Sequence, residues 1–243
     1  MWSLLLFVPT RGRPDSVAEL LAAVDETAEG FVRVVFVVDP DDQERELYRR
    51  AIREFGRTHQ VEVELFVTSG ASAGRGMVGA LNEAVAGTNL CSAAAVGFLG
   101  DDHRPRTRGW DVELQKALKV KGFGLAYGND LVHGPGLPTA VVMSLRVVVA
   151  LGFMAPPVLR HLYVDNYWLS LGKHLDAITY LPHVVIEHMH PLVGKAPEDE
   201  GYRRVNAAAV VAADAAAFDI YVRTGGVQRD ADLVRRCYQS GGA

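Results

Sequence analysis

The chain has 243 residues, and its 49% hydrophobic and 22% charged content is that of an ordinary globular protein. With 25 Lys and Arg against 29 Asp and Glu, the net charge of −4 argues against bulk capture of nucleic acid or of an anionic membrane surface. No stretch approaches the ~20 apolar residues of a membrane span, and Cys91 and Cys237 match no metal-binding spacing, so we expect a protein of the reducing cytoplasm without a transmembrane segment.

The first hundred residues alternate between apolar strands and amphipathic helices. In the first helix Val17, Leu20 and Leu21 begin the i, i+3, i+4 spacing of one buried face. Strands are expected over 3–8, 31–38, 61–67 and 93–99, with helices around 17–24, 42–57 and 77–86. This order predicts an α/β fold with an open, mostly parallel central sheet and helices on both faces.

Beyond Asp102 the alternation becomes irregular. The expected elements are a helix around 110–118, a strand over 139–143, a helix over 164–175, an extended segment over 177–189 and helices over 203–223 and 230–238. Neither a repeat nor a linker interrupts the sequence, so we expect one domain over 1–243, with a parallel half over 1–102 and a mixed half over 103–243.

Polar clusters follow the strands at the points where the strands end. They occupy 9–14, 39–42, 100–103 and 187–191. In a parallel sheet the carboxyl ends of the strands share one edge, and ligands bind there. Aspartates at such places also cap helices or form turns, which is the alternative for Asp41 and Asp42. The clusters together favour a ligand site at this edge.

Asp101 and Asp102 are adjacent carboxylates at the end of a buried strand, which is electrostatically unfavourable without a positive partner. A divalent cation is the simplest partner, and a solvated turn is the alternative. If the segment 188–190 is extended, the imidazoles of His188 and His190 share one face, and one of them can supply a nitrogen ligand. A mixed oxygen and nitrogen ligand set suits Mn²⁺ better than Mg²⁺.

These segments resemble the family 2-like glycosyltransferases of the GT-A fold. The resemblance covers residues 4–110 in order and extends more loosely to about residue 190. It rests on the 9–14 loop after the first strand, Asp39 at the end of the second, Leu-Asn-Glu-Ala at 81–84 and Phe-Leu-Gly-Asp-Asp at 98–102. It implies a GT-A-like fold in which the half 1–102 binds the nucleotide, while the half 103–243 binds the acceptor and carries the C-terminal helices.

The resemblance also implies a donor site. The nucleotide contacts are expected from Pro9, Thr10, Arg11, Arg13, Asp39, Arg75 and Asp101, and the metal ligands are expected to be Asp102 and His190, with His188 as the alternative histidine. The acidic motif of the family usually begins with an aspartate, where this chain has Gly100. Asp101 and Asp102 must therefore carry the role of the motif.

The catalytic and acceptor-binding residues are expected in the second half. Asp165 resembles the acid that the family places at the start of a later helix, although Val164 replaces the glutamate that usually precedes it. We expect Asp165 to be the general base that activates the acceptor hydroxyl. Acceptor contacts are expected from Asn129 and Asp130, for which a plain turn is the alternative, and from Trp168, whose ring can stack on a sugar face.

The expected function is metal-dependent transfer of a sugar, of the hexosyl type, from a nucleotide-diphosphate sugar to a hydroxyl of a glycan, protein or small molecule. The alternatives are a nucleotidyltransferase of GT-A-like fold and a non-catalytic nucleotide- or sugar-binding protein. A more distant alternative is an NAD-dependent oxidoreductase, because residues 74–79 match the pattern GxGxxG. That pattern should directly follow its strand, whereas residues 68–73 intervene here.

Overall fold

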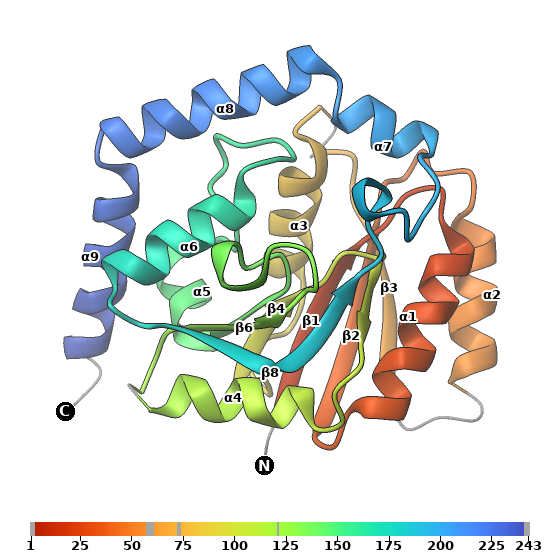
Figure 1. Ribbon diagram of the computed structural model, residues 1–243, viewed down its shortest axis with the longest axis horizontal. Helices are drawn as coiled ribbons and strands as arrows, with labels where there is room; N and C mark the ends of the chain where they lie inside the picture. The colour runs from red at the N-terminus through yellow and green to blue at the C-terminus, as the bar shows by residue number, and fades with distance from the viewer. Residues whose placement is uncertain (1–2, 57–60, 72–73, 121, 241–243) are drawn as a thin grey trace.

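Strands from both halves of the chain form one central sheet. The computed structural model describes residues 3–56, 61–71, 74–120 and 122–240, and within them an eight-stranded sheet has the order β3-β2-β1-β4-β7-β6-β8-β5 (Figure 1). The strands are β1 Ser3–Pro9, β2 Phe31–Val38, β3 Glu62–Val67, β4 Ala95–Phe98, β5 His103–Pro105, β6 Leu125–Asn129, β7 Val141–Ser144 and β8 Ile178–His188. The helices are α1 Pro14–Thr27, α2 Arg45–Phe55, α3 Gly76–Gly87, α4 Trp110–Lys119, α5 Leu145–Leu151, α6 Val164–His174, α7 Glu200–Val205, α8 Ala208–Arg223 and α9 Gly226–Ser240.

Strand directions determine which loops meet at one edge of the sheet. The first four strands are parallel to one another, β7 runs antiparallel to both β4 and β6, and β8 is parallel to β6. Because two reversals restore the original direction, β8 ends at the same edge as β1, β2 and β4. The predicted α/β fold, with a mostly parallel sheet that becomes mixed in its C-terminal half, is confirmed.

Helices cover both faces of the sheet, since alternate residues of a buried strand point to opposite sides. Leu5 and Phe7 of β1 pack in one core with residues of α3, α5, α6 and α9, whereas Leu4 and Leu6 pack in a second core with α1 and α4. The continuous apolar sequence of β1 thus serves two cores. Within the described residues we find no helix with the length and apolar character needed to cross a membrane.

Several helices differ from the sequence prediction: α5 was not expected, α1 and α9 are longer than expected, and the expected end at residue 57 lies outside the described residues. Two further differences have a local cause. The helix expected from residue 42 begins at Arg45, because the Asp42 carboxylate forms the preceding turn and accepts the backbone N–H of Glu44 at 2.8 Å. The single helix expected over 203–223 is two helices, α7 and α8, because Asn206 ends the first by donating its side-chain amide to Tyr202 O at 2.9 Å. The break lets α8 cross the top of the molecule in Figure 1.

Candidate active site

The polar segments that follow β1, β2, β4 and β8 meet at the carboxyl edge of the sheet. Thr10 N–H donates to Val37 O at 3.0 Å, which holds the loop after β1 against the end of β2. Met189 N–H donates to Asp102 O at 2.8 Å, so the end of β8 lies directly on the acidic turn after β4. Strand direction therefore brings together clusters that lie far apart in the sequence.

The first loop holds the acidic turn through Thr10 and Arg13. The Thr10 hydroxyl donates to Asp101 Oδ2 at 2.7 Å, and Arg13 Nη1 donates to Asp101 Oδ1 at 3.0 Å. The same guanidinium binds Asp199, just before α7, through Nε at 2.6 Å and Nη2 at 3.0 Å. Arg13 thus joins the loop after β1 to the acidic turn and to the C-terminal segment.

A second arginine of this loop is held in a similar way. Arg11 Nη1 donates to Asp39 Oδ2 at 3.0 Å, and the guanidinium forms a bidentate pair with Asp41 at 2.7 and 2.9 Å. Pro9, which ends β1, is half-buried directly before this loop. Arg11 and Arg13 are therefore both held by carboxylates at the carboxyl edge of the sheet, and an anionic ligand would compete with these acids for the two guanidinium groups.

The adjacent carboxylates differ in their electrostatic environment. Burial and the neighbouring Asp102 charge raise the pKa of Asp101 to about 6, in spite of the Arg13 guanidinium. Burial alone would also raise the pKa of Asp102, but the imidazoles of His103 and His188 hold it well below its usual range. Asp102 therefore stays ionised to lower pH than Asp101, and an ionised carboxylate is what a cation requires as a ligand.

Gly100 lies against the side chains of Asp102 and His103. A Cβ at residue 100 would clash with Asp102 Oδ1 and would lie 2.9 Å from His103 Nδ1. The Gly100 N–H donates to this same His103 nitrogen at 2.9 Å. A side chain at residue 100 would therefore require the Asp102 and His103 side chains to move.

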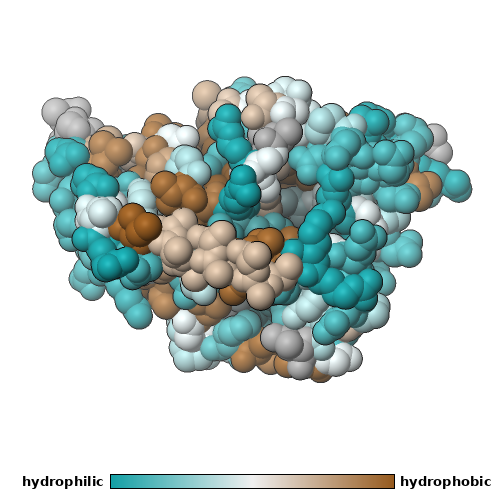
Figure 2. All heavy atoms as spheres, turned by 90° about the horizontal axis from the view of Figure 1, so that it is seen from above, coloured by the Kyte–Doolittle hydropathy of each residue, from teal (hydrophilic) through white to brown (hydrophobic). Residues whose placement is uncertain are grey.

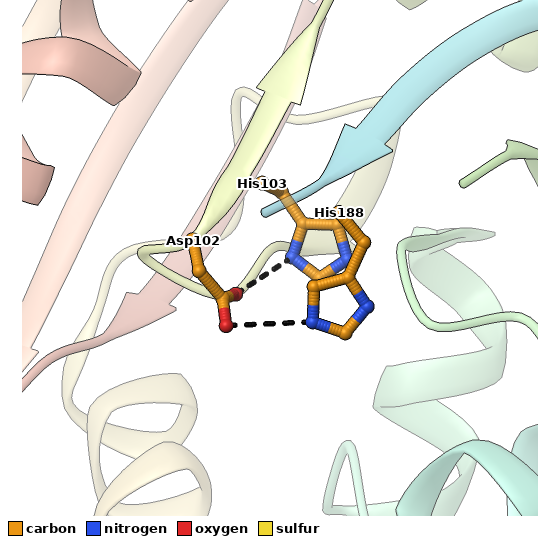
Figure 3. A group of neighbouring side chains, drawn as sticks. All are labelled: Asp102, His103 and His188. Carbon is orange, nitrogen blue, oxygen red and sulfur yellow. Dashed lines mark ion pairs between the residues drawn. The ribbon is translucent and has the colours of Figure 1, made fainter. Parts of the chain in front are cut away.

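Asp102, His103 and His188 form a cluster that could hold a metal ion (Figure 3). Asp102 Oδ2 lies 3.4 Å from His188 Nε2, which is longer than an ordinary hydrogen bond. Two ligands of one ion, each bonded at about 2.1 Å, lie about 3.0–3.4 Å apart. His188 Nδ1, the other ring nitrogen, is buried without a hydrogen-bond partner among the described residues and does not take part in this pair. The donor set and its spacing therefore fit a divalent cation.

His103 packs beside this pair but is less suited to be a ligand. Its Nδ1 accepts the Gly100 N–H, and its Nε2 lies 3.4 Å from the Thr139 hydroxyl. The ring stacks on His188 with centroids 4.4 Å apart. His103 thus orients the neighbouring imidazole, in the way that groups behind a ligand usually do.

His190, the histidine expected at the metal, lies one ring further out. Its ring contacts that of His188 edge-on, with centroids 4.7 Å apart, and contacts Tyr202 of α7 at 5.5 Å. Burial and the neighbouring His188 lower the pKa of His190, which favours the neutral form that binds metals. The structure thus places His188 next to Asp102, with His190 beside it.

A second group, comprising Asp130, His133 and His188, also has metal-like spacing. Asp130 Oδ1 accepts the backbone N–H groups of Val132, His133 and Gly134. Asp130 Oδ2 accepts the Thr139 hydroxyl at 3.0 Å and lies 2.9 Å from His133 Nδ1. Both oxygens are therefore used within the loop. Asp130 is buried and organises the turn, which was the alternative to its expected role as an acceptor contact.

Asp165 lies in the first turn of α6 and faces the same region. Burial raises its pKa, while the Asn166 N–H, which donates to Oδ1 at 2.9 Å, and the imidazoles of His133 and His188 act in the opposite direction. A carboxylate with a raised pKa, close to the candidate metal cluster, has the properties of a general base.

Of the other two residues expected to contact the acceptor, one is placed differently. Trp168 is fully buried, donates from Nε1 to Met154 O at 2.8 Å and packs against Phe98. The expectation that Trp168 stacks on a sugar is therefore wrong: α6 turns its apolar face, with Trp168, into the core. Asn129, at the end of β6, is partly exposed and accepts the Leu131 N–H at 3.0 Å.

Arg75 precedes α3 and is exposed. It lines a cavity of about 330 Å³ together with α3 residues and Phe153. The glycine pattern at 74–79 thus forms the start of α3, after the third strand, rather than the first turn of a dinucleotide-binding unit.

The sequence reasoning missed two residues that act at the site. Asp199 binds Arg13, and Asp214 of α8 holds the loop that precedes Asp165. Each is one acid among many in the C-terminal half, and no spacing relates it to its partner. Their contacts depend on how α7 and α8 fold back over the sheet edge.

Comparison with solved structures identifies the fold. A mannosyltransferase, PcManGT from Pyrobaculum calidifontis, solved with GDP-Man and Mn²⁺, superposes with a TM-score of 0.59 at 14% identity, covering 99% of this chain and 76% of that one. Glucosyl-3-phosphoglycerate synthase from Mycobacterium tuberculosis, solved with Mn²⁺ and UDP, gives 0.57 at 14% identity, with coverage of 89% and 80%. S. aureus TarS with UDP gives 0.53 at 12% identity, with coverage of 76% and 59%.

Sequence comparison adds no closer relative. Neither a protein-family model nor a curated protein matches the sequence. The structural neighbours are 12–14% identical to this chain, which shows the fold alone. The chain therefore has the fold of the GT-A glycosyltransferases.

Proposed function

We propose that this protein is a metal-dependent glycosyltransferase that moves a sugar, of the hexosyl type, from a nucleotide-diphosphate sugar to an acceptor hydroxyl. The observation that carries the proposal is the pairing of Asp102 with His188 at the sheet edge, beside Asp101 and Arg13 and facing Asp165. The site combines a candidate cation ligand set, cationic groups suited to phosphate and a carboxylate suited to proton transfer. The structural neighbours support it, since two of them were solved with Mn²⁺ and a nucleotide or nucleotide sugar.

The residues of the first half form the proposed donor site. Asp39 at the end of β2 accepts hydrogen bonds from the ribose or base, as acids do at this edge of open sheets. Arg11 and Arg13 exchange their contacts with Asp41 and Asp199 for the diphosphate, because a guanidinium binds phosphate and carboxylate in the same bidentate way. Arg75 at the start of α3 approaches the phosphates from the other side.

Asp102 and one histidine of the 188–190 segment would hold the cation. When bound, a divalent cation supplies charge neutralisation for the departing diphosphate without a proton transfer. The mixed oxygen and nitrogen set supports Mn²⁺ over Mg²⁺. Cys91 and Cys237 are exposed and unpaired, which supports the expectation of a reducing, cytoplasmic location.

Asp165 is the proposed general base if the anomeric centre inverts. The acceptor oxygen forms a bond to the anomeric carbon, while the bond from that carbon to the diphosphate oxygen breaks and its electron pair leaves with the nucleoside diphosphate. The proton of the acceptor hydroxyl passes to the Asp165 carboxylate. The raised pKa of Asp165 improves its match to a proton acceptor near neutral pH.

Calorimetry with GDP and UDP, each with Mn²⁺ and with EDTA, tests the donor site. We expect one nucleotide to bind with Mn²⁺ and to lose most of its affinity with EDTA. Release of free sugar from GDP- and UDP-sugars, measured in parallel, then separates an enzyme from a binding protein.

Two results would contradict the proposal. Nucleotide binding that is indifferent to chelator would remove the metal from the mechanism. Release of pyrophosphate from a nucleoside triphosphate in the presence of a sugar 1-phosphate, with no sugar released from the nucleotide sugars, would instead identify a nucleotidyltransferase, since that reaction breaks the bond between the α- and β-phosphates.

A further inference from the structure

The outer helix α8 carries one buried residue, and that residue is an acid. Along α8 the exposed positions are mostly alanine, and Figure 2 shows an apolar stripe across the face that this helix occupies. Asp214 is 2% exposed, although aspartate is rarely buried without partners. Since burial of a carboxylate is unfavourable unless it is hydrogen-bonded, its partners indicate what the helix does.

The Asp214 carboxylate accepts three consecutive backbone N–H groups from the loop between α5 and α6. Oδ1 accepts Arg160 N–H at 3.0 Å, and Oδ2 accepts the N–H groups of His161 and Leu162, each at 2.8 Å. Hydrogen bonds to an ionised acceptor are about twice as strong as neutral ones. The loop segment 160–162 is therefore held by a single side chain of a distant helix.

The clamped loop leads in two directions. On one side Arg160 O accepts the Val78 N–H at 3.0 Å, and it approaches α3 so closely that a Cβ on Gly76 would clash with it. On the other side the chain passes through Tyr163, with φ of 65°, and enters α6 at Val164, the residue before Asp165. The loop thus links the start of α3, next to Arg75, to the start of α6.

We infer that Asp214 is a positioning residue: by holding 160–162 it fixes the starts of α3 and α6 relative to each other. The catalytic consequence of this inference rests on the proposed function. If Asp165 is the base and Arg75 approaches the donor phosphates, the clamp determines the position of Asp165 relative to the donor. A displacement of about 1 Å between reacting groups lowers rates by roughly 10²-fold, so a clamp outside the site can control turnover. Asp214 itself contacts neither substrate nor cation in this mechanism.

The test compares Asp214→Asn with a matched control, Asp111→Asn. Asp111 of α4 is also a fully buried carboxylate, and it accepts the backbone N–H groups of Glu29 and Gly30 at 3.0 and 2.8 Å. Its helix α4 packs with α1 in the second core, on the other face of the sheet from α3 and α6. Both variants lose a buried charge and some stability, but only Asp214→Asn releases the 160–162 loop. Asp219→Asn, an exposed site on α8, controls for the helix itself.

Hydrogen exchange followed by mass spectrometry is the first measurement, and it does not depend on activity. In Asp214→Asn we expect peptides that contain 160–162 and Val78 to exchange at least about tenfold faster, because their amides lose their acceptor or its support. In Asp111→Asn the faster exchange should be confined to 29–30. Unchanged exchange at 160–162 in Asp214→Asn would overturn the clamp.

Turnover per folded molecule is the second measurement. We expect Asp214→Asn to lower kcat by roughly tenfold or more, with a smaller change in KM for the donor, because positioning acts on the reacting geometry. The Asp111→Asn and Asp219→Asn variants should keep the wild-type kcat. Equal kcat in Asp214→Asn and Asp111→Asn, with the loop released, would reduce Asp214 to a stability role. A wild-type protein that transfers no sugar would instead refute the proposed function, while the exchange data would still decide the clamp.

Discussion

The two halves of the sheet contribute to the site by different routes. In the parallel half each strand delivers its own residues, so that Thr10, Asp39 and Asp101 follow β1, β2 and β4 directly. In the mixed half the residues arrive through contacts between distant segments, as when Arg13 binds Asp199, 186 positions away. We call the first half, residues 1–102, the platform, because strand direction alone brings its residues to the edge. We call the second half, residues 103–243, the cover, because its residues reach the edge through tertiary contacts.

This difference predicts a division of labour. The platform holds most of the charged groups suited to a nucleotide and a cation, whereas the cover holds Asp165, the loop that positions it and the histidines of the 188–190 segment. Variants of the platform and of these histidines should therefore weaken binding, and other variants of the cover should weaken turnover or stability.

The largest effect is expected at Asp102. Asp102→Ala removes the ionised carboxylate of the candidate metal cluster, so Mn²⁺-dependent nucleotide binding should be lost, because the anionic ligand then meets Asp101 without a cation. Calorimetry with and without Mn²⁺ measures this, and retained Mn²⁺-dependent affinity would contradict it. His188→Ala and His190→Ala, measured alongside, show which imidazole is the ligand: the true one should weaken the Mn²⁺ effect more strongly.

The next effect is expected on turnover at Asp165. Asp165→Asn keeps the shape and the contact to Asn166 but removes the proton acceptor, so kcat should fall by roughly 10²-fold or more. Donor affinity should stay nearly unchanged, because Asp165 belongs to the cover. Steady-state kinetics with the donor varied separates kcat from KM. Near-normal kcat would reject the base and favour a retaining mechanism.

A pH effect on stability is expected from His161 in the clamped loop. Burial lowers the pKa of His161 to about 4, although the nearby Asp214 charge acts in the opposite direction. In the unfolded chain this histidine is protonated below about pH 6.5, whereas in the folded state it stays neutral down to about pH 4. Stability should therefore fall as pH decreases from 6.5 towards 4, by about 2 kcal/mol at pH 5. Urea unfolding at pH 7 and pH 5 should show a smaller loss in His161→Gln than in wild type. An equal loss in both proteins would place the acid sensitivity elsewhere.

The smallest effects compare Asp39 with Asp199, the platform and cover partners of Arg11 and Arg13. Asp39→Ala should weaken nucleoside diphosphate binding about tenfold, the size of one hydrogen bond to a charged group. Asp199→Asn should change it by less than about fivefold, because its pair with Arg13 is partly exposed. Calorimetry on both variants checks this. An equal loss of nucleotide affinity in Asp199→Asn would contradict this prediction and would show that the segment before α7 contributes to nucleotide binding.

The order of elements in the platform, and the polar residues at its edge, can be predicted from the local sequence. Apolar periodicity records which face of a strand or helix is buried, and polar residues at strand ends mark the edge where ligands bind. That information is local, which is why the α/β sheet and the grouping of Thr10, Arg13 and Asp101 were predicted and found.

How the second half covers this edge depends on the tertiary structure and cannot be read from the local sequence. Sheet pairing sets His188 beside Asp102, with His190 one ring away, although the spacing of the two histidines treats them alike. Helix packing turns Trp168 into the core, and the fold of α8 brings Asp214 onto a loop more than fifty positions away. These contacts join segments with no shared periodicity, since they depend on strand order and helix crossing rather than on the local sequence.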